Sequence, residues 1–351
     1  MLRICYFDRL LNLELFETTL TQGRDIEVTR VHDGMTDAEV ADVLSTVHGY
    51  HTRGGQALVP PRFRIDEDFL AKCPNLVAAC TAGAGFDIVN LDHCNEAGVL
   101  FANQSGLNAE AVAEHAIAMM MCLSKKIAQV NMALRRDPEL DRFAYRNNEV
   151  FEKTIGIVGL GNIGTRVAEV CSMAFRMNIL ATHPRLSPEE AERRHARLVP
   201  LDELLEQSDF VLVACGLNDE TRGMFGAEAF KKMKQSAYFL TIGRGGIHEE
   251  EALAHALETD QVAGAGLDVW MQEPPPIDHP LLKFDNVLAS PHIAANTVES
   301  AHKGALGAAK QWRAIMEGKV PVRIKNPEVW PKYSERFEKI MDFTPEKRPN
   351  A

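Results

Sequence analysis

The sequence contains no long hydrophobic run and no block of basic residues. Its longest apolar stretch, residues 116–123, is far shorter than the roughly 20 residues that a membrane-spanning helix needs. Acidic residues outnumber basic ones, 49 to 38, which gives a net charge of −11. A chain with this charge balance does not attract nucleic acid or an anionic membrane surface. We therefore expect a soluble protein that binds neither.

Metal-binding and disulfide patterns are also absent. The seven cysteines are odd in number and scattered, most lie in apolar stretches, and no two form a CxxC pair. Such a distribution is typical of reduced core residues in a reducing compartment. The first residues, MLRICYF, have the pattern of a strand and not that of a signal peptide with a cleavage site. We expect a cytoplasmic protein without a metal site.

A glycine-rich turn between a strand pattern and a helix pattern is the most informative motif that is present. The apolar run 155–158 leads into GxGxxG spacing and then into a helical pattern. The first glycine permits a tight turn, the second lets the backbone approach a pyrophosphate, and the third lets the helix pack on the strand. GxGxxG also occurs in loops that bind no nucleotide, but the flanking strand and helix favour a dinucleotide site. Its predicted cofactor-binding residues are Gly159, Gly161, Asn162, Ile163 and Gly164.

Strand and helix patterns alternate along most of the chain, which predicts an α/β fold. Residues 103–299 are predicted to form a nucleotide-binding domain with a Rossmann-type, doubly wound parallel sheet, whose ligands lie at the carboxyl ends of the strands. Residues 1–102 show the short elements of a smaller α/β domain, to which the chain returns at 300–330. Residues 331–351 are predicted to be a C-terminal tail that covers a surface or a partner.

Three polar residues follow predicted strands of the nucleotide-binding domain: Arg244, Glu273 and His292. An arginine can hold a carboxylate with two hydrogen bonds, a histidine can transfer the proton that accompanies hydride transfer, and a neighbouring carboxylate can orient the histidine ring. Together they suit a 2-keto acid. Each residue alone is more often a surface ion-pair partner, a solvated loop residue or a helix cap.

Eight motifs occur in order along the chain: AGAGFD (82–87), NAEAVAEHA (108–116), GIVGLGNIG (156–164), LDELLEQSDFV (201–211), TIGRGG (241–246), AGLDVWMQEP (265–274), HPLL (279–282) and SPHIAANT (290–297). With these motifs the chain resembles the D-2-hydroxyacid dehydrogenase family, also called D-isomer specific 2-hydroxyacid dehydrogenases, over nearly its whole length.

The resemblance implies an NAD(P)-dependent oxidoreductase that interconverts a 2-keto acid and an (R)-2-hydroxy acid. It implies that Arg244 binds the substrate's carboxylate and keto oxygen, that His292 is the acid/base, and that Glu273 is the partner of His292. It also implies a homodimer and a discontinuous, flavodoxin-like substrate domain. Substrate contacts are implied for the loop Gly83, Ala84 and Gly85, and for Arg53. Further cofactor contacts are implied for Thr221, Ile242, Gly243 and Asp268.

The chain departs from the family pattern at three places. The segment ATHPR (181–185) has His183 where NAD-preferring members have an acidic residue, and Arg185 follows two residues later. A histidine and an arginine suit a 2′-phosphate, so we expect NADP to be preferred over NAD. Ala214 and Gly216 replace the usual His and Pro after the fourth strand, and Gly243 stands where Ala or Ser is usual.

Two other interpretations stay open at this point. A nucleotide-sensing binding protein would keep the same fold and the same three polar residues, although nothing in this chain resembles the peptide-docking termini of such relatives. Arg53 could be a structural ion-pair partner, whereas His51 and Thr52, with aromatic residues of the tail, are expected to line the substrate pocket.

Formate dehydrogenases carry Gln at the position of Glu273, and phosphoglycerate dehydrogenases often add a regulatory domain, so we favour neither. The sequence does not specify which 2-keto acid is used.

Overall fold

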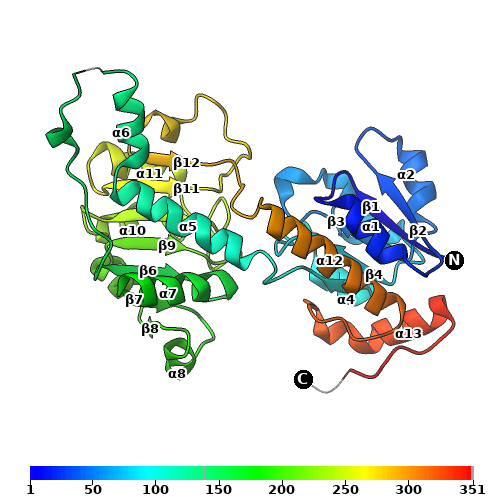
Figure 1. Cartoon of the computed structure of the whole chain (residues 1–351). Coiled ribbons are helices and arrows are strands. Elements are labelled where there is room, and N and C mark those ends of the chain that lie inside the picture. Colours follow the sequence, from blue (N-terminus) through cyan, green and yellow to red (C-terminus); the bar gives the residue numbers. More distant parts are fainter. Residues whose placement is uncertain (138, 349–351) are drawn as a thin grey trace. The chain divides into compact units, whose positions relative to one another are not determined.

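The computed structural model describes residues 1–137 and 139–348 and divides into two units (Figure 1). Unit 1 comprises Met1–Asn108 and the chain from Thr297 onward, and unit 2 comprises Ala109–Asn296. The sequence-based boundaries lie at 102/103 and 299/300. Of the tail predicted at 331–351, residues 349–351 lie outside the described part of the chain.

Unit 2 is built on a seven-stranded parallel sheet in the order β12-β11-β10-β9-β6-β7-β8. This is the doubly wound, Rossmann-type order, with β6 at the point where the strand order reverses. The strands are β6 (Thr154–Val158), β7 (Asn178–Thr182), β8 (Arg197–Leu198), β9 (Phe210–Val213), β10 (Tyr238–Thr241), β11 (Gly264–Leu267) and β12 (Val287–Ala289). The predicted Rossmann-type sheet is confirmed.

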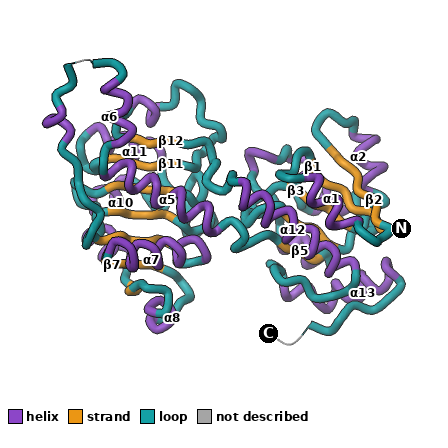
Figure 2. Tube along the Cα trace, viewed as in Figure 1, coloured by secondary structure: helices purple, strands orange, loops and turns teal. Residues whose placement is uncertain are grey.

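Helices cover both faces of this sheet (Figure 2). The helices are α5 (Ala109–Ser124), α6 (Ile127–Leu134), α7 (Asn162–Phe175), α8 (Pro188–Glu192), α9 (Leu201–Gln207), α10 (Ala227–Lys232) and α11 (Glu250–Glu258), with short 3-10 turns η3 (Arg142–Tyr145) and η4 (Pro280–Lys283). Side chains alternate along each strand, so Ile155 and Ile157 pack with α5 and α7, while Val158 packs with α9, α10 and α11.

Residues 109–134 form two helices, α5 and α6, because the chain turns at Lys126, which has a φ of 53°. Helix α5 buries residues such as Met119 and Met120 against α7 and the sheet, so these methionines fill the core. Helix α6, by contrast, has no buried residue. No helix in the described part of the chain combines the length and apolarity needed to cross a bilayer.

Unit 1 contains a five-stranded parallel sheet in the flavodoxin-like order β2-β1-β3-β4-β5, as the family resemblance implies. Its strands are β1 (Leu2–Phe7), β2 (Ile26–Val31), β3 (Gly49–Thr52), β4 (Ala78–Thr81) and β5 (Leu100–Ala102). Its helices are α1 (Leu13–Thr21), α2 (Asp37–Leu44), α3 (Glu67–Ala71), α4 (Leu91–Ala97), α12 (Val298–Met316) and α13 (Trp330–Met341), with 3-10 turns η1 (Gln56–Leu58), η2 (Pro61–Phe63) and η5 (Pro327–Val329).

The last two helices complete the core of unit 1. Trp312 on α12 is buried beside β3, where a Cβ on Gly49 would lie 2.6 Å from its ring, and Tyr333 and Phe337 on α13 are also buried. The segment that the sequence sets apart as a tail therefore packs within unit 1. The expectation that His51, Thr52 and tail aromatics line a substrate pocket is wrong for these buried residues, because the His51 ring stacks on Phe16 and its Nδ1 accepts a hydrogen bond from Trp312.

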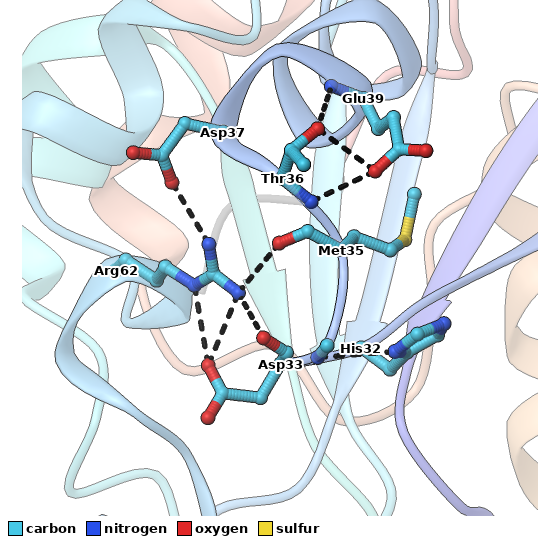
Figure 3. A network of polar contacts seen from close by, with 8 residues as sticks. His32, Asp33, Met35, Thr36, Asp37, Glu39 and Arg62 are labelled. Carbon is cyan, nitrogen blue, oxygen red and sulfur yellow. Dashed lines mark hydrogen bonds and ion pairs between the residues drawn. The ribbon is translucent and has the colours of Figure 1, made fainter.

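The segment after β2 is held by polar contacts on the surface of unit 1 (Figure 3). Thr36 and Glu39 form a capping box at the start of α2. Arg62 of η2 binds Asp33 and Asp37 and also donates to the main-chain oxygen of Met35. The stretch 54–64 contains two 3-10 turns, and Phe63 is buried in the core.

Candidate active site

The glycine turn of unit 2 leaves room for a ligand at one glycine and packs tightly at the other two. Gly159 has a φ of 100°, and a Cβ there would lie 2.8 Å from the Cys215 nitrogen. A Cβ on Gly164 would lie 2.2 Å from the Gly159 oxygen, whereas one on Gly161 would contact nothing within 4 Å. Among the residues that the structure describes, no side chain caps the N-terminus of α7, which begins at Asn162. The turn therefore fits the pyrophosphate of a dinucleotide.

The loop after β9 lies between two glycines. Cys215 packs against Gly159 on one side, and a Cβ on Gly243 would lie 2.6 Å from its oxygen on the other. Glycine at position 243, one of the three departures, therefore allows this loop to approach β10 closely. Burial raises the pKa of the Cys215 thiol to about 11, so the thiol is neutral and unreactive at physiological pH. Thr221 closes the same loop, since its hydroxyl donates to the Gly216 oxygen at 2.8 Å.

Arg244 leaves the carboxyl end of β10 and is half-buried. Its Nη1 donates to the Gly243 oxygen at 2.8 Å. The next residue, Gly245, allows this loop to dock on the loop after β11, because a Cβ there would lie 1.9 Å from the Trp270 oxygen. That contact brings Arg244 into the neighbourhood of Glu273, whose pKa the arginine charge helps to lower.

Glu273 and His292 form a hydrogen-bonded pair. Oε2 of Glu273 lies 2.7 Å from Nδ1 of His292, and Oε1 accepts from the Trp270 nitrogen at 3.2 Å. Burial raises the pKa of Glu273, but the hydrogen bond and charge of His292, the Trp270 N–H and Arg244 outweigh burial, so the pKa falls below its usual value. An ionised carboxylate only accepts, so Nδ1 carries a proton and Nε2 is left for another partner.

Asp268 lies at the end of β11 and is fully buried. Its carboxylate accepts from the Ser290 hydroxyl and from the main-chain nitrogens of Ile293 and Ala294. Its main-chain oxygen accepts from the His292 nitrogen at 2.7 Å. Asp268 therefore holds the segment that carries His292.

His183, Arg185 and Arg194 lie near one another beside the glycine turn. Burial, then Arg194 and then Arg185, lower the pKa of His183 against a smaller opposing effect of Glu190. Arg194 is half-buried, and its Nη1 donates to the Leu160 oxygen within the turn at 2.7 Å. Arg185 is exposed. Within 1–137 and 139–348, no carboxylate lies within ion-pair distance of Arg194.

The candidate substrate-binding residues Gly83, Ala84 and Gly85 lie after β4 of unit 1. Their carbonyl groups turn into the fold: the Gly83 oxygen accepts from the Gln104 nitrogen and the Ala84 oxygen accepts from the Asn103 amide. Their N–H groups make no hydrogen bond to another described residue, so they are available to an anion.

Arg53, the fourth candidate substrate-binding residue, lies just after β3 and is partly exposed. It has no ion-pair partner among the residues that the structure describes. The structure thus gives no support to the interpretation of Arg53 as a structural ion-pair partner.

A family model described as "D-isomer specific 2-hydroxyacid dehydrogenase, NAD binding domain" matches residues 117–294 of this chain. Glyoxylate/hydroxypyruvate reductase B of Pectobacterium carotovorum subsp. carotovorum (strain PC1) is 36% identical over 291 residues, which cover 82% of this chain and 88% of that protein. The chain belongs to the D-isomer specific 2-hydroxyacid dehydrogenase family.

Two further relatives show the range of this family. D-3-phosphoglycerate dehydrogenase of Archaeoglobus fulgidus is 38% identical over 243 residues, 69% of this chain but 46% of that protein. The crystal structure of D-lactate dehydrogenase from Aquifex aeolicus, complexed with NAD and lactic acid, has a TM-score of 0.77 and 25% identity and covers 90% of this chain and 96% of that one. The predicted family, the oxidoreductase class and the nicotinamide cofactor are therefore confirmed.

In this 2-hydroxyacid dehydrogenase, Arg194 is a candidate cofactor-binding residue that the sequence analysis did not identify. Its position in the sequence gave no signal, because it follows α8 and lies 34 residues beyond Leu160, to which it is bonded. A paired arginine, Arg193 and Arg194, at the end of a short helix usually indicates a solvated surface. The hydrogen bond to the glycine turn and its partial burial distinguish Arg194 from the exposed Arg193.

The close approach at Gly245 gives a prediction about the position of Arg244. Replacing Gly245 with Ala forces the two loops apart, and a shift of about 1 Å at Arg244 should lower kcat/KM about 100-fold. Steady-state kinetics and thermal unfolding of the variant test this. Gly304→Ala, on α12, is the matched control because its Cβ meets only the Ala82 oxygen at 3.9 Å. Parental kcat/KM in Gly245→Ala would show that the loop contact does not position Arg244.

Proposed function

We propose that this dehydrogenase interconverts a small 2-keto acid and its (R)-2-hydroxy acid through Arg244, Glu273 and His292. The observation that carries the proposal is the 2.7 Å hydrogen bond between Glu273 and His292, in a loop cluster that also includes Arg244. The nicotinamide, when bound, supplies or accepts the hydride. Among 2-keto acids, glyoxylate and hydroxypyruvate are the proposed substrates, since the reductase from Pectobacterium is named for them.

Each residue then has a distinct task in the reduction. The guanidinium of Arg244 binds the carboxylate and polarises the keto oxygen. His292 donates the proton on Nε2 to that oxygen as the carbonyl carbon is reduced, which leaves a hydroxyl group. Glu273 keeps Nδ1 protonated and so fixes the ring orientation. In unit 1 the backbone N–H groups of the loop 83–85 are proposed to bind the substrate carboxylate, with Arg53 as a further contact.

Replacement of the proposed catalytic residues tests these roles. Arg244→Ala should raise KM and lower kcat together, with kcat/KM reduced about 100- to 1000-fold because a charged donor to the substrate is lost. His292→Asn should lower kcat about 100- to 10,000-fold with little change in KM. The assay is NADPH and NADH oxidation with glyoxylate, hydroxypyruvate, pyruvate, and branched and aromatic 2-keto acids.

The same assay separates the enzyme from a nucleotide-sensing protein. Turnover on none of the acids, combined with tight cofactor binding measured by fluorescence, would support the sensor and contradict the proposal. Parental kcat in His292→Asn would remove His292 from the chemistry.

We also propose that NADP is preferred and that the residues responsible are Arg194, Arg185 and His183. Desolvation and the two arginines favour neutral His183 in the absence of cofactor, so the arginines supply the positive charge. A half-buried guanidinium that is fixed by the Leu160 oxygen and lacks a carboxylate among the described residues suits a 2′-phosphate. The remaining cofactor contacts proposed are the glycine turn with Asn162 and Ile163. Thr221, Ile242, Gly243 and Asp268 are proposed as cofactor contacts as well.

The cofactor preference can be tested with an adjacent pair of arginines. Arg194→Ser should raise the KM for NADPH about 10-fold and change the KM for NADH much less, because only NADPH carries the phosphate that the guanidinium binds. Arg193→Ser makes the same charge change at an exposed neighbouring position and should leave both KM values at their parental level. His183→Asp should shift preference toward NADH. Equal effects of Arg194→Ser on both cofactors would contradict the assignment.

We propose finally that the protein is a homodimer that covers α6. This helix carries no charged residue, yet Ile127 and Leu134 are 56% and 67% exposed. Phe143 in η3, also in unit 2, is exposed as well. An apolar helix without a buried residue is typical of a subunit interface.

Charged substitutions on α6 test the dimer. Ile127→Glu combined with Leu134→Glu should convert the dimer to a monomer in sedimentation or light-scattering measurements, because two charges would have to be buried without partners. Met173→Glu is the control, since Met173 is a single exposed apolar residue on α7. A parent protein that is monomeric at micromolar concentration would rule out this interface.

A further inference from the structure

The proposed acid/base, His292, has an unusual backbone conformation. Its φ of 56° lies in the left-handed region, which is unfavourable for a residue other than glycine. Such a conformation persists only when surrounding contacts specify it. The contacts around His292 therefore decide where its ring can lie.

Asp268 supplies most of these contacts. It binds the main chain at three successive residues, through its own carbonyl oxygen to His292 and through its carboxylate to Ile293 and Ala294. The carboxylate is 1% exposed and also accepts the Ser290 hydroxyl at 2.7 Å. A buried carboxylate needs such donors, since an unpaired charge would be strongly unfavourable there.

His115 on α5 completes this group of contacts. Its Nε2 lies 3.0 Å from Oγ of Ser290 and 3.7 Å from Oδ1 of Asp268. Ser290 has one hydroxyl hydrogen and gives it to Oδ1 of Asp268, which also accepts from the main-chain nitrogen of Ile293. Nε2 of His115 must therefore carry a proton and donate it to Ser290. The direction of every hydrogen bond from His115 to Asp268 follows from this count.

Ser290 is also held on its other side. The indole nitrogen of Trp270 donates to the main-chain oxygen of Ser290 at 2.9 Å, and the Trp270 main-chain nitrogen donates to the carboxylate of Glu273. Trp270 thus connects the partner of His292 to the residue that His115 binds. A change in the position of Ser290 would reach both members of the Glu273–His292 pair.

We propose that His115 is a positioning residue for His292, acting through Ser290 and Asp268. This inference rests on the proposed role of His292 as the acid/base. His115 touches neither His292 nor Glu273 in the described contacts. Its Nε2–H donor fixes the rotamer of Ser290, which lets the carboxylate of Asp268 hold the main chain of the 290–294 segment in its left-handed turn.

The test compares variants that keep or remove the Nε2 donor. His115→Phe keeps an aromatic ring without the donor and should lower kcat about 10-fold, because His292 loses its alignment with the keto oxygen. His115→Gln places an amide N–H close to the position of Nε2 and should restore most of the lost kcat. The affinity for NADPH, measured by fluorescence titration, should stay at the parental value in both variants. The pH at which kcat falls on the acid side of its pH profile should shift in His115→Phe and stay at the parental value in His115→Gln.

Ser290→Ala provides the second route to the same answer. It should lower kcat as His115→Phe does, and the double variant should be no worse than either single variant, since both break one chain of hydrogen bonds. If His115→Phe does not fold, the kcat of Ser290→Ala tests the proposed chain of hydrogen bonds by itself. His255→Phe, at an exposed position on α11, is the control and should have parental kinetics.

Three results would overturn the inference: parental kcat in His115→Phe, equal losses in His115→Phe and His115→Gln, or parental kcat in Ser290→Ala. His292→Asn in the same series separates this inference from the proposed function. If His292→Asn retains parental kcat, the acid/base assignment itself is wrong. If His292→Asn loses activity while the His115 and Ser290 variants do not, only the positioning role is wrong.

Discussion

Close backbone contacts between loops hold the candidate active site of unit 2 together. Gly159, Gly243 and Gly245 each lie where a Cβ would come within 3 Å of a neighbouring main-chain atom. Two of these contacts enclose Cys215 and fix the loop after β9, and the third docks the Arg244 loop on Trp270. The site is therefore built from main-chain packing before any side chain is placed.

The carboxylates of Asp268 and Glu273 lie at the same edge of the sheet but have different roles, because their surroundings differ. Asp268 is fully buried, and its carboxylate accepts hydrogen bonds from three residues of the 290–294 segment. Glu273 is only partly covered by the fold and directs one oxygen to the ring of His292. One carboxylate shapes the main chain, and the other orients the side chain that this main chain carries. This division explains how a residue with left-handed backbone geometry can still present its ring in a fixed direction.

The positive charge beside the glycine turn is also held in a fixed position. Arg194 is tied to a carbonyl of the turn, so its position is set by the fold and not by a flexible surface. The residue that replaces the usual acid, His183, is held uncharged by desolvation and by the two arginines. A preference for NADP, which carries a 2′-phosphate, would then depend on the guanidinium of Arg194. This residue is distant in sequence from the end of β7.

Local hydrophobic periodicity and short motifs were enough to predict the α/β class, the order of most elements, the glycine turn and the family. The sequence also indicated Arg244, Glu273 and His292, since each follows a strand of a parallel sheet. Strand β3 is hard to recognise in the sequence because Gly49–Thr52 is short and wholly buried and so shows no alternation, and its packing depends on Trp312 from the far end of the chain. The contacts that make His51, Tyr333 and Phe337 core residues, that join Arg194 to the glycine turn, and that join His115 to Ser290 are visible in the folded structure alone. Those relations arise from contacts between residues far apart in sequence, and periodicity along the chain does not record such contacts.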